Sequence, residues 1–344
     1  MVDFHRLITE WYRLNKRNLP WRETKNPYFI WLSEIILQQT RVAQGLSYYL
    51  KFVDHYPTVS DLANASELAV LNDWQGLGYY SRARNLHASA KYISEELNSV
   101  FPDEHKCIMN LKGVGDYTAA AIASFSFDLP HAVVDGNVYR VLSRVFDVDL
   151  PIDSTEGKKY FAQLAQELLP VNYAAIHNQA IMEFGALHCL PANPLCDSCP
   201  LTNICLALSV GSISDRPIKS KKIKVRNRFF HYLVFKENGN ILLSKRENKD
   251  IWQHLYEFPL IETDEELSFS EMKLIFEDKF ELQPVWCSEF STHKLSHQKI
   301  IARFYFFDKI PETIIGSYDV AQSIDIQDYP LPRLIDRFLE KFEL

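Results

Sequence analysis

Residues 111–122 read LKGVGDYTAAAI, in which a pair of glycines precedes a run of small residues. The apolar segment Cys107-Ile108-Met109 comes just before, so the pattern predicts two helices joined by a tight hairpin. Gly113 and Gly115 let the backbone approach a ligand closely, and the following helix start favours an anion such as a nucleic-acid phosphate. An ordinary turn between two helices is the simpler interpretation, because G-x-G alone is weak evidence.

The chain around this hairpin is expected to be helical from residue 1 to residue 208. Apolar residues recur at helical spacing, as at Leu86, Ala90 and Ile93, and alternating β-branched residues are scarce. After residue 228 the pattern changes. Strand-like runs at 229–235 and 241–243 flank Asn238-Gly239, a strong hairpin signal. A helix at 271–280 and a strand at 300–307 complete the expected α+β fold of this second part.

The length of 344 residues predicts two domains, and the composition is that of an ordinary globular protein. Hydrophobic residues make up 47% and charged residues 24% of the chain, which excludes disordered, collagen-like and disulfide-dense classes. No run of about 18 apolar residues suggests a membrane span, and the first residues carry no apolar signal region. We therefore expect a cytoplasmic protein.

The net charge of −7 argues weakly against nucleic-acid binding until it is divided along the chain. Residues 211–230 carry seven basic and one acidic side chain, a net charge of +6, whereas the parts before and after them are acidic. Local patches decide contact with phosphates. The segment is either a basic connector that lies along DNA or a plain solvated linker. Its basic residues are Arg216, Lys219, Lys221, Lys222, Lys224, Arg226 and Arg228.

Four of the six cysteines lie within 17 positions, spaced C-x6-C-x2-C-x5-C. In a chain without a secretory signal, such clustering favours a metal site over a disulfide framework. Zinc sites usually combine two short C-x2-4-C pairs, and this segment has one, so a [4Fe–4S] cluster is preferred over zinc. The proposed ligands are Cys189, Cys196, Cys199 and Cys205.

Two carboxylates stand out as candidates for acid–base chemistry. Glu34 lies among Trp31, Ile35 and Leu37, and a carboxyl in such surroundings would have a raised pKa. Asp135 precedes a helical segment that it could simply cap. Two carboxyls in unlike environments can divide the roles of acid and of nucleophile or charge stabiliser. A Glu on a polar helix face and a capping Asp remain the simpler readings of each.

Together these motifs resemble the endonuclease III superfamily of DNA glycosylases and, within it, the MutY-type adenine DNA glycosylases. The likeness covers essentially the whole chain. It is carried by residues 19–22 (LPWR), 33–40 (SEIILQQT), 76–84 (GLGYYSRAR), the hairpin, 134–138 (VDGNV), 182–186 (MEFGA) and the cysteine loop.

The resemblance implies a catalytic site built on Glu34 as the acid and Asp135 as the second carboxylate, with Asn137 and Tyr117 beside them. Bifunctional relatives have a Lys in the hairpin where this chain has Tyr117. Because a Tyr cannot form a Schiff base, the resemblance implies hydrolysis without an amine nucleophile. The residues expected to contact the adenine or the surrounding duplex are Trp21, Arg22, Leu37, Gln39, Thr40, Tyr79, Tyr80, Gly113, Gly115 and Glu183.

The second part resembles the MutT-like (Nudix-like) recognition domain of this family, through residues 242–246 (LLSKR), 251–252 (IW) and 255–259 (LYEFP). The R-E-x-x-E-E core of a Nudix hydrolase is absent, so the domain should read a base. The family's F-S-H loop appears as Leu295, Ser296 and His297, with Leu in place of Phe. The expected domains are residues 1–210, with the cluster loop at 189–205, the connector 211–227, and the recognition domain 228–344.

We therefore expect a monomeric enzyme that excises adenine mispaired with 8-oxoguanine or guanine in double-stranded DNA and carries a [4Fe–4S] cluster. Three alternatives remain open. They are a glycosylase/lyase for oxidised pyrimidines, a non-catalytic iron–sulfur DNA-binding protein, and nucleotide hydrolysis by the second domain. Tyr117 counts against the lyase, because it cannot form a Schiff base. The two carboxylates count against a non-catalytic protein, and the missing metal-binding core counts against nucleotide hydrolysis.

Overall fold

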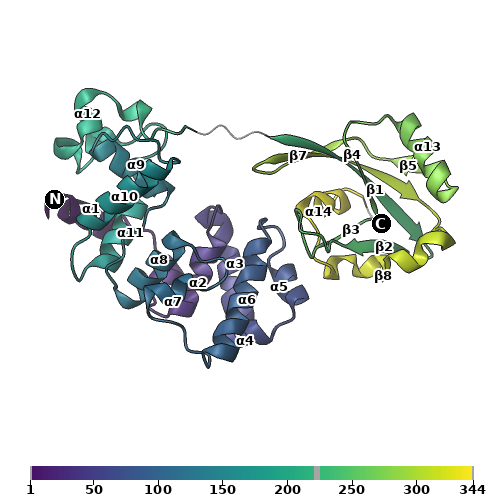
Figure 1. The fold of residues 1–344 in the computed structure, drawn as a ribbon, viewed down its shortest axis with the longest axis horizontal. Helices are drawn as coiled ribbons and strands as arrows, with labels where there is room; N and C mark the ends of the chain where they lie inside the picture. The colour runs from purple at the N-terminus through teal and green to yellow at the C-terminus, as the bar shows by residue number, and fades with distance from the viewer. Residues whose placement is uncertain (1, 221–224, 343–344) are drawn as a thin grey trace. The chain divides into compact units, whose positions relative to one another are not determined.

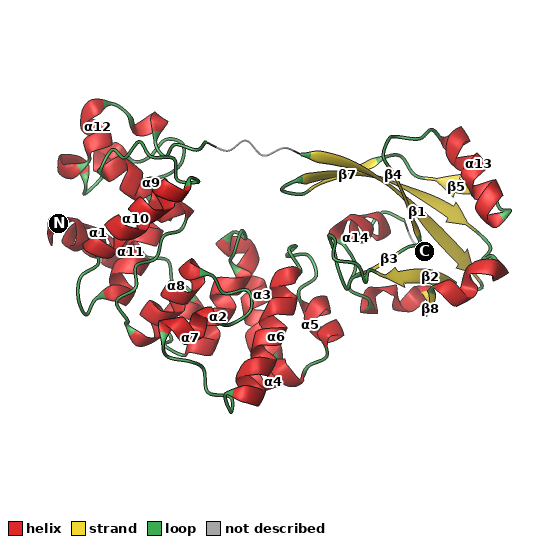
Figure 2. Ribbon diagram, in the orientation of Figure 1, coloured by secondary structure: helices red, strands yellow, loops and turns green. Residues whose placement is uncertain are grey.

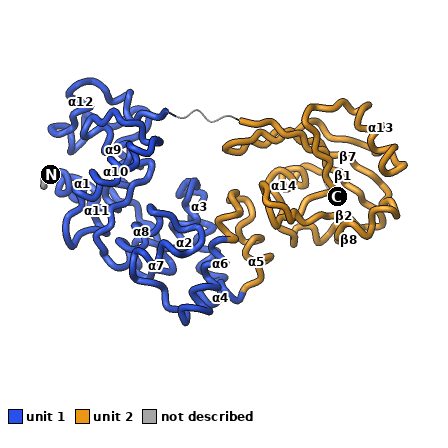
Figure 3. The backbone as a smooth tube through the Cα atoms, viewed as in Figure 1, with its two compact units in different colours: residues 1–64, 85–221 blue, residues 65–84, 222–344 orange. Residues whose placement is uncertain are grey.

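The computed structural model describes residues 2–220 and 225–342. It divides into two compact units, shown in blue and orange in Figure 3. Unit 1 comprises Met1–Asn64 and Asn85–Lys221, and unit 2 comprises Ala65–Arg84 and Lys222–Leu344. The domain boundaries expected from the sequence stay a prediction. The segment 65–84, placed by sequence in the first domain, here packs with the second part of the chain.

Unit 1 is helical throughout its described residues, as Figure 2 shows in red. Its α-helices are α1 (Val2–Asn15), α2 (Pro27–Ile36), α3 (Val42–His55), α4 (Val59–Asn64), α6 (Ser81–Glu96, whose first turn belongs to unit 2), α7 (His105–Met109), α8 (Asp116–Phe127), α9 (Gly136–Val145), α10 (Thr155–Leu168), α11 (Ala174–Leu187) and α12 (Leu206–Val210). Short 3-10 turns lie at Pro20–Arg22, Cys196–Ser198, Thr202–Ile204 and Ile213–Asp215.

The predicted hairpin is formed by α7, the turn at residues 110–115, and α8. Gly113 has φ +79°, a left-handed conformation that other residues rarely adopt, and a Cβ there would lie 2.8 Å from Asn85 Cβ. The small residues of α8 are buried from Thr118 to Ser124, which lets α2 and α11 pack closely on two sides of it. This packing fixes α8 at the centre of the unit and places Tyr117 in its first turn, where the side chain is partly buried.

Unit 2 combines α5 (Glu67–Asp73) with an eight-stranded sheet, α13 (Phe269–Phe280) and α14 (Arg333–Leu339). The strands are β1 (Arg226–Glu237), β2 (Asn240–Lys245), β3 (Tyr256–Glu257), β4 (Leu260–Thr263), β5 (Trp286–Cys287), β6 (Ser291–Lys294), β7 (Gln298–Phe307) and β8 (Asp319–Gln322). The long strands β1 and β7 pair in parallel from Arg226 opposite Gln298 to Phe235 opposite Phe307. This pairing forms the middle of the sheet.

The local signals of the second part are confirmed with small shifts in position. Asn238 and Gly239 both have positive φ and join β1 to β2 in the expected hairpin. The helix predicted from residue 271 begins at Phe269, because Ser268 and Glu271 form a reciprocal capping box. The strand predicted from residue 300 begins at Gln298, next to the loop that carries Ser296 and His297.

Part of the positive charge predicted for residues 211–230 is paired with carboxylates inside the protein. Less than the expected charge of +6 is therefore available to DNA. Arg216 forms a 3.0 Å ion pair with Asp147 of unit 1. Arg228 is buried in unit 2 and pairs with Asp250 and Glu262 at 2.7 and 2.6 Å. The sequence pattern could not reveal these partners, because each lies more than 20 positions away. The connector lysines at 221, 222 and 224 lie outside the described residues.

No helix among the described residues is both long and apolar enough to cross a membrane.

Candidate active site

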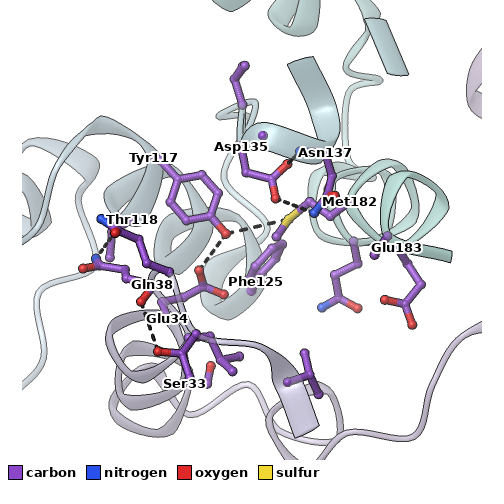
Figure 4. A pocket seen from close by; sticks show the side chains of 18 of the residues that line it. Ser33, Glu34, Gln38, Tyr117, Thr118, Phe125, Asp135, Asn137, Met182 and Glu183 are labelled. Atoms are coloured by element: carbon purple, nitrogen blue, oxygen red, sulfur yellow. Dashed lines mark hydrogen bonds between the residues drawn. The ribbon is translucent and has the colours of Figure 1, made fainter. Parts of the chain in front are cut away.

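A pocket of about 1110 Å³ opens in unit 1 between the hairpin, α2, α9 and α11 (Figure 4). It collects side chains from five stretches that the sequence singled out separately. The expected site residues that line it are Trp21, Arg22, Glu34, Leu37, Gln39, Thr40, Gly115, Tyr117, Asp135, Asn137 and Glu183.

Glu34 lies in the last part of α2, a helix whose residues are almost all buried, and is 8% exposed. Burial raises the pKa of its carboxyl to about 7. The hydroxyl of Tyr117, which donates to Oε2 at 2.8 Å, lowers this pKa, while the charge of Asp135 raises it. The polar-face reading of Glu34 is therefore excluded, and the group can hold a proton near neutrality.

Tyr117 stands at the start of α8 and reaches Glu34 from the opposite wall of the pocket (Figure 4). Its hydroxyl also approaches the sulfur of Met182 at 4.0 Å. Burial and the neighbouring carboxylates raise the pKa of the phenol well above its ordinary value, so the group stays protonated. It can therefore serve as a fixed hydrogen-bond donor to Glu34.

Asp135 caps α9 and faces the pocket at the same time. Its Oδ1 accepts hydrogen bonds from the backbone N–H groups of Asn137 and Val138 at 2.8 and 2.7 Å, and its Oδ2 accepts one from Asn137 Nδ2 at 2.9 Å. Burial raises the pKa of Asp135, while these hydrogen bonds lower it. Asp135 can therefore cap α9 and still present its carboxylate to the pocket.

Arg140 connects this carboxylate to the cysteine loop. Its Nη2 donates to Asn137 Oδ1 at 2.8 Å and to the carbonyl oxygen of Gly185 at 2.6 Å. Its Nε donates to the carbonyl oxygen of Cys189 at 2.8 Å. The position of the Asn137 amide, and through it that of Asp135, is therefore tied to the first cysteine of the loop.

Glu183 lines the pocket and is 1% exposed. Its two oxygens accept bidentate hydrogen bonds from both Arg17 and Arg22, at 2.6 to 2.9 Å. Burial alone would raise its pKa, but the bonds from Arg22 and Arg17 outweigh burial and lower the pKa to about 2. Glu183 is thus a fixed anion with its acceptor sites largely occupied.

Two of the expected duplex-contacting residues have a left-handed backbone, Gln39 with φ 55° and Tyr79 with φ 48°. Such a conformation is unusual for these residue types and tends to occur at functional positions. Tyr79 is 46% exposed, whereas Tyr80 is buried at 4% and its hydroxyl donates to the carbonyl oxygen of Leu331. Of the two tyrosines, only Tyr79 is therefore exposed to solvent.

Ser296 and His297 are exposed in the tight loop between β6 and β7 of unit 2. The hydroxyls of Ser296 and Tyr79 are hydrogen-bonded to each other within this unit. Leu295 packs its side chain against the apolar core of the unit, so it anchors the loop without the aromatic ring of the family motif. Among the other expected site residues, Gly113 does not line the pocket of unit 1 and lies in the hairpin turn before α8.

The cysteine loop folds its four thiols around one small cavity beside α9 and α11. Arg144 of α9 donates to the sulfur of Cys189, and the backbone N–H of Leu201 donates to that of Cys199, both at 3.4 Å. Burial, together with charge on the other three cysteines, raises the pKa of the Cys199 thiol to about 11, against the backbone N–H of Leu201, which lowers it. The influence of all three other cysteines reflects their convergence. Among residues 2–220 and 225–342, no three His, Cys, Asp or Glu side chains are grouped as ligands of a single metal ion.

Comparison with known proteins agrees with this architecture. A model of the HhH-GPD superfamily of base excision DNA repair proteins matches residues 32–170. The adenine DNA glycosylase of Buchnera aphidicola subsp. Baizongia pistaciae is 36% identical over 297 residues, which cover 86% of this chain and 83% of that protein. That of Buchnera aphidicola subsp. Schizaphis graminum is 31% identical over 345 residues, which cover 99% of each chain.

This chain belongs to the adenine DNA glycosylases. A NUDIX domain model matches residues 231–341, which confirms the expected kind of second domain. The solved structure of a thermostable thymine-DNA glycosylase is similar to this adenine DNA glycosylase with a TM-score of 0.56 and 29% identity, covering 60% of this chain and 95% of that one. Glycosylases named for different bases thus share this fold, so the fold alone does not determine which base is removed.

Sequence reasoning missed two arginines of this adenine DNA glycosylase. Arg17 lies just before the LPWR motif, and its partner Glu183 is 166 positions away. Arg140 lies five residues after Asp135, one helical turn beyond Asn137, so the spacing on α9 could have indicated it.

Proposed function

We propose that the protein is a monofunctional adenine DNA glycosylase that hydrolyses the N-glycosidic bond of adenine opposite 8-oxoguanine or guanine in duplex DNA. The observation that carries the proposal is the pairing of two carboxyls in one pocket. Glu34 has a pKa of about 7 and a tyrosine donor, and Asp135 is held by three N–H groups. The proposal also rests on the family to which the chain belongs.

Glu34 supplies the proton that adenine needs as a leaving group. Neutral adenine leaves slowly, and protonation of N7 makes it a better leaving group. A carboxyl with a pKa near the working pH is suited to this transfer, which is typically worth about 10²–10⁴-fold in rate. Tyr117 orients the carboxyl through Oε2 and leaves its other oxygen to carry the proton.

Asp135 acts on the sugar. Departure of the base leaves positive charge on the deoxyribose, and a nearby carboxylate stabilises that charge or bonds to the sugar transiently. The N–H groups at the start of α9 and the Asn137 amide fix the carboxylate before the charge develops. Water then adds to the sugar, so that the products are free adenine and an abasic site.

Position 117 carries a phenol and not an amine, which supports hydrolysis without a Schiff base. Lys158 also lines the pocket, so the assignment has a direct test. Borohydride should trap no covalent adduct between the unmodified protein and the substrate. An adduct that disappears in Lys158→Ala would contradict the monofunctional proposal.

The four cysteines fit a [4Fe–4S] cluster. They converge on one cavity, and two N–H donors point at their sulfur atoms, an arrangement that tunes cluster thiolates. When bound, the cluster supplies a rigid scaffold for the loop and takes no part in hydrolysis. Anaerobically purified protein should contain iron and sulfide in a 4:4 ratio. A colourless protein with one zinc would overturn this assignment.

Unit 2 is proposed to read the base opposite the adenine. Ser296 is exposed beside Tyr79, and its hydroxyl can both donate and accept a hydrogen bond, as the N7–H and O8 of 8-oxoguanine require. His297 lies next to Ser296 and is exposed. If its side chain is only solvated, His297→Ala should leave excision unchanged. The compared relatives are bacterial and the proposed substrate is duplex DNA, so we also propose that the enzyme works in the cytoplasm. The proposal treats it as a monomer.

The test uses duplexes with one A:8-oxoguanine pair, one A:G pair or one thymine glycol, followed by alkali. We expect cleavage at adenine in the first two and none in the third. Ser296→Ala should lower excision selectively opposite 8-oxoguanine, because one hydrogen bond is worth about 0.5–1.5 kcal/mol. The exposed Ser270→Ala serves as its control. Release of thymine glycol would favour the oxidised-pyrimidine alternative.

A further inference from the structure

The first part of the connector is fixed to unit 1. Arg144 of α9 donates through Nε to the carbonyl oxygens of Ile213 and Arg216, at 3.2 and 3.3 Å. Further along, the backbone N–H of Ile152 donates to the carbonyl oxygen of Ile218 at 3.0 Å. Residues 213–218 therefore run beside α9 as part of the folded unit (Figure 1).

The far end of this stretch is anchored as well. Asp153 accepts hydrogen bonds from the backbone N–H and the hydroxyl of Ser220, at 2.9 and 3.1 Å. Lys219 is thus held between two anchored neighbours, Ile218 and Ser220. The sequence predicted that Lys219 belongs to a connector between domains. In the structure, hydrogen bonds to unit 1 hold the backbone on both sides of it.

The anchored stretch forms one wall of a second cavity, of about 460 Å³. The start of α9, which follows the Asp135 cap, also lines this cavity. The lining residues are Gly136, Asn137, Arg140, Ile152, Pro191, Pro217 and Lys219. Four of these, Gly136, Asn137, Arg140 and Pro191, also line the active-site pocket, so the two cavities adjoin.

The charge of this second cavity is positive. Its described lining residues include Arg140 and Lys219 and no acidic side chain. Arg140 donates to the carbonyl oxygens of Cys189 and Gly185 and to the Asn137 amide, all neutral acceptors, so hydrogen bonding does not neutralise its charge. Lys219 is exposed, and within the described part of the chain no ion pair involves it. The charge of Asp135 acts on Arg140 from the active-site side, whereas Lys219 faces the second cavity without such a neighbour among its lining residues. A solvated surface lysine is the simpler reading, but it does not account for the fixed backbone on both sides of Lys219.

We propose that Lys219 binds a backbone phosphate of the DNA next to the nucleotide whose base is removed, and that residues 212–220 are a fixed wall of the DNA-binding face. The inference rests on the proposed function, since it assumes duplex DNA in the adjoining active-site pocket. A phosphate diester suits the site because its single negative charge matches an ammonium group for which residues 2–220 and 225–342 supply no carboxylate partner.

The test compares full-length Lys219→Ala with Lys91→Ala, an exposed lysine of α6 that lines neither cavity. Single-turnover excision is measured against enzyme concentration at several salt concentrations. Lys219→Ala should raise the half-saturating concentration about three- to tenfold and reduce the salt slope by about 0.9, as expected for one lost phosphate contact. Lys219→Arg should retain wild-type binding, and so should Lys91→Ala. Equal affinity and slope in Lys219→Ala and wild type would overturn the proposal.

A second variant tests the fixed wall by the sign of its effect. Asp153→Ala removes a negative charge, so electrostatics alone predicts tighter DNA binding. If Asp153 holds the stretch that carries Lys219, the same change should weaken binding at an unchanged melting temperature. Tighter binding would overturn the fixed-wall part. Failure of the wild-type protein to release adenine would instead contradict the proposed function, so the two failures are distinguishable.

Discussion

The phenolic hydroxyl of Tyr117 donates a 2.8 Å hydrogen bond to Oε2 of Glu34, across the pocket from α8 to α2. The bond favours the ionised form of Glu34, while burial favours the protonated form and prevails, so the pKa lies at about 7. The tyrosine thus keeps this carboxyl within the range where it can give up a proton at neutral pH.

Tyr117→Phe should raise the pKa of Glu34, because it removes the bond that favours the carboxylate. The proposed reaction needs the protonated acid, so the wild-type rate should fall as the pH rises through about 7. In the variant this alkaline limb should move to higher pH. Single-turnover excision between pH 5 and 9 measures it, and an unmoved limb would separate Tyr117 from the titration of Glu34.

Glu34→Gln should abolish most adenine release yet stabilise the protein at high pH. The pKa of Glu34 in the folded protein, about 7, lies above the ordinary value of 4.5. Below pH 4.5 the carboxyl is protonated in both the folded and the unfolded state, so its burial does not lower the free energy of unfolding. As the pH rises from 4.5 through 7, the unfolded state ionises more easily and the wild-type protein loses stability. Gln cannot ionise and avoids this cost, which is roughly 3 kcal/mol at pH 8. Thermal melts at pH 5 and pH 8 should show a gain mainly at the higher pH. A gain that is equal at both would contradict the burial argument.

Local signals in the sequence predicted much of this site. The apolar neighbours of Glu34 indicated its burial, and the residues after Asp135 indicated a capped helix. The glycine hairpin placed Tyr117 at a helix start. Each signal depends on residues within one or two turns, where backbone preferences and periodicity act.

Long-range pairing could not be predicted in the same way. Arg17 and Glu183 meet only because α1 and α11 pack together, and no local pattern marks that contact. Arg216 and Arg228 read as free positive charge until their carboxylate partners are seen. The packing of residues 65–84 in unit 2 likewise depends on contacts such as Glu67 with His254.

Glu183→Gln should destabilise the protein, in contrast to Glu34→Gln. Arg22, whose side chain is 10% exposed, would keep its charge but lose this carboxylate, and breaking such a buried pair costs about 3–5 kcal/mol. The loss at Arg17, which is 35% exposed, should be smaller because water can replace the carboxylate. The pKa of about 2 lies below 4.5, so the wild-type advantage is present above pH 4.5 and declines as the pH falls toward 2. Melts of this variant and of the exposed control Glu96→Gln at pH 3 and pH 7 measure the effect. Equal melting temperatures of both variants at pH 7 would refute it.

Arg140→Lys should slow excision while leaving substrate binding largely intact. A lysine keeps the charge but cannot bond Cys189, Gly185 and Asn137 together from one planar group. Loss of one such bond, about 1.4 kcal/mol, corresponds to roughly a tenfold lower rate. Single-turnover rates at saturating enzyme are compared with those of Arg6→Lys on the exposed face of α1. A change in half-saturation alone would assign Arg140 to binding and not to the positioning of Asp135.

Asp135→Asn separates the capping role of Asp135 from its proposed role at the sugar. Asn is as good a helix cap as Asp, and its side-chain oxygen can still accept from the N–H groups of Asn137 and Val138. The variant loses only the charge and the Oδ2 acceptor, so its melting temperature should change little. Excision should fall by orders of magnitude, because the charge on the sugar is no longer compensated.

Asp135→Ala is the matched comparison, since it removes both roles and should cost a further ~1 kcal/mol of stability through the lost cap. Thermal melts and single-turnover rates of both variants give the answer together. If activity falls only in step with stability, the carboxylate is a cap and the catalytic assignment fails. If Asp135→Asn is stable and inactive, the negative charge at this helix start acts on the substrate.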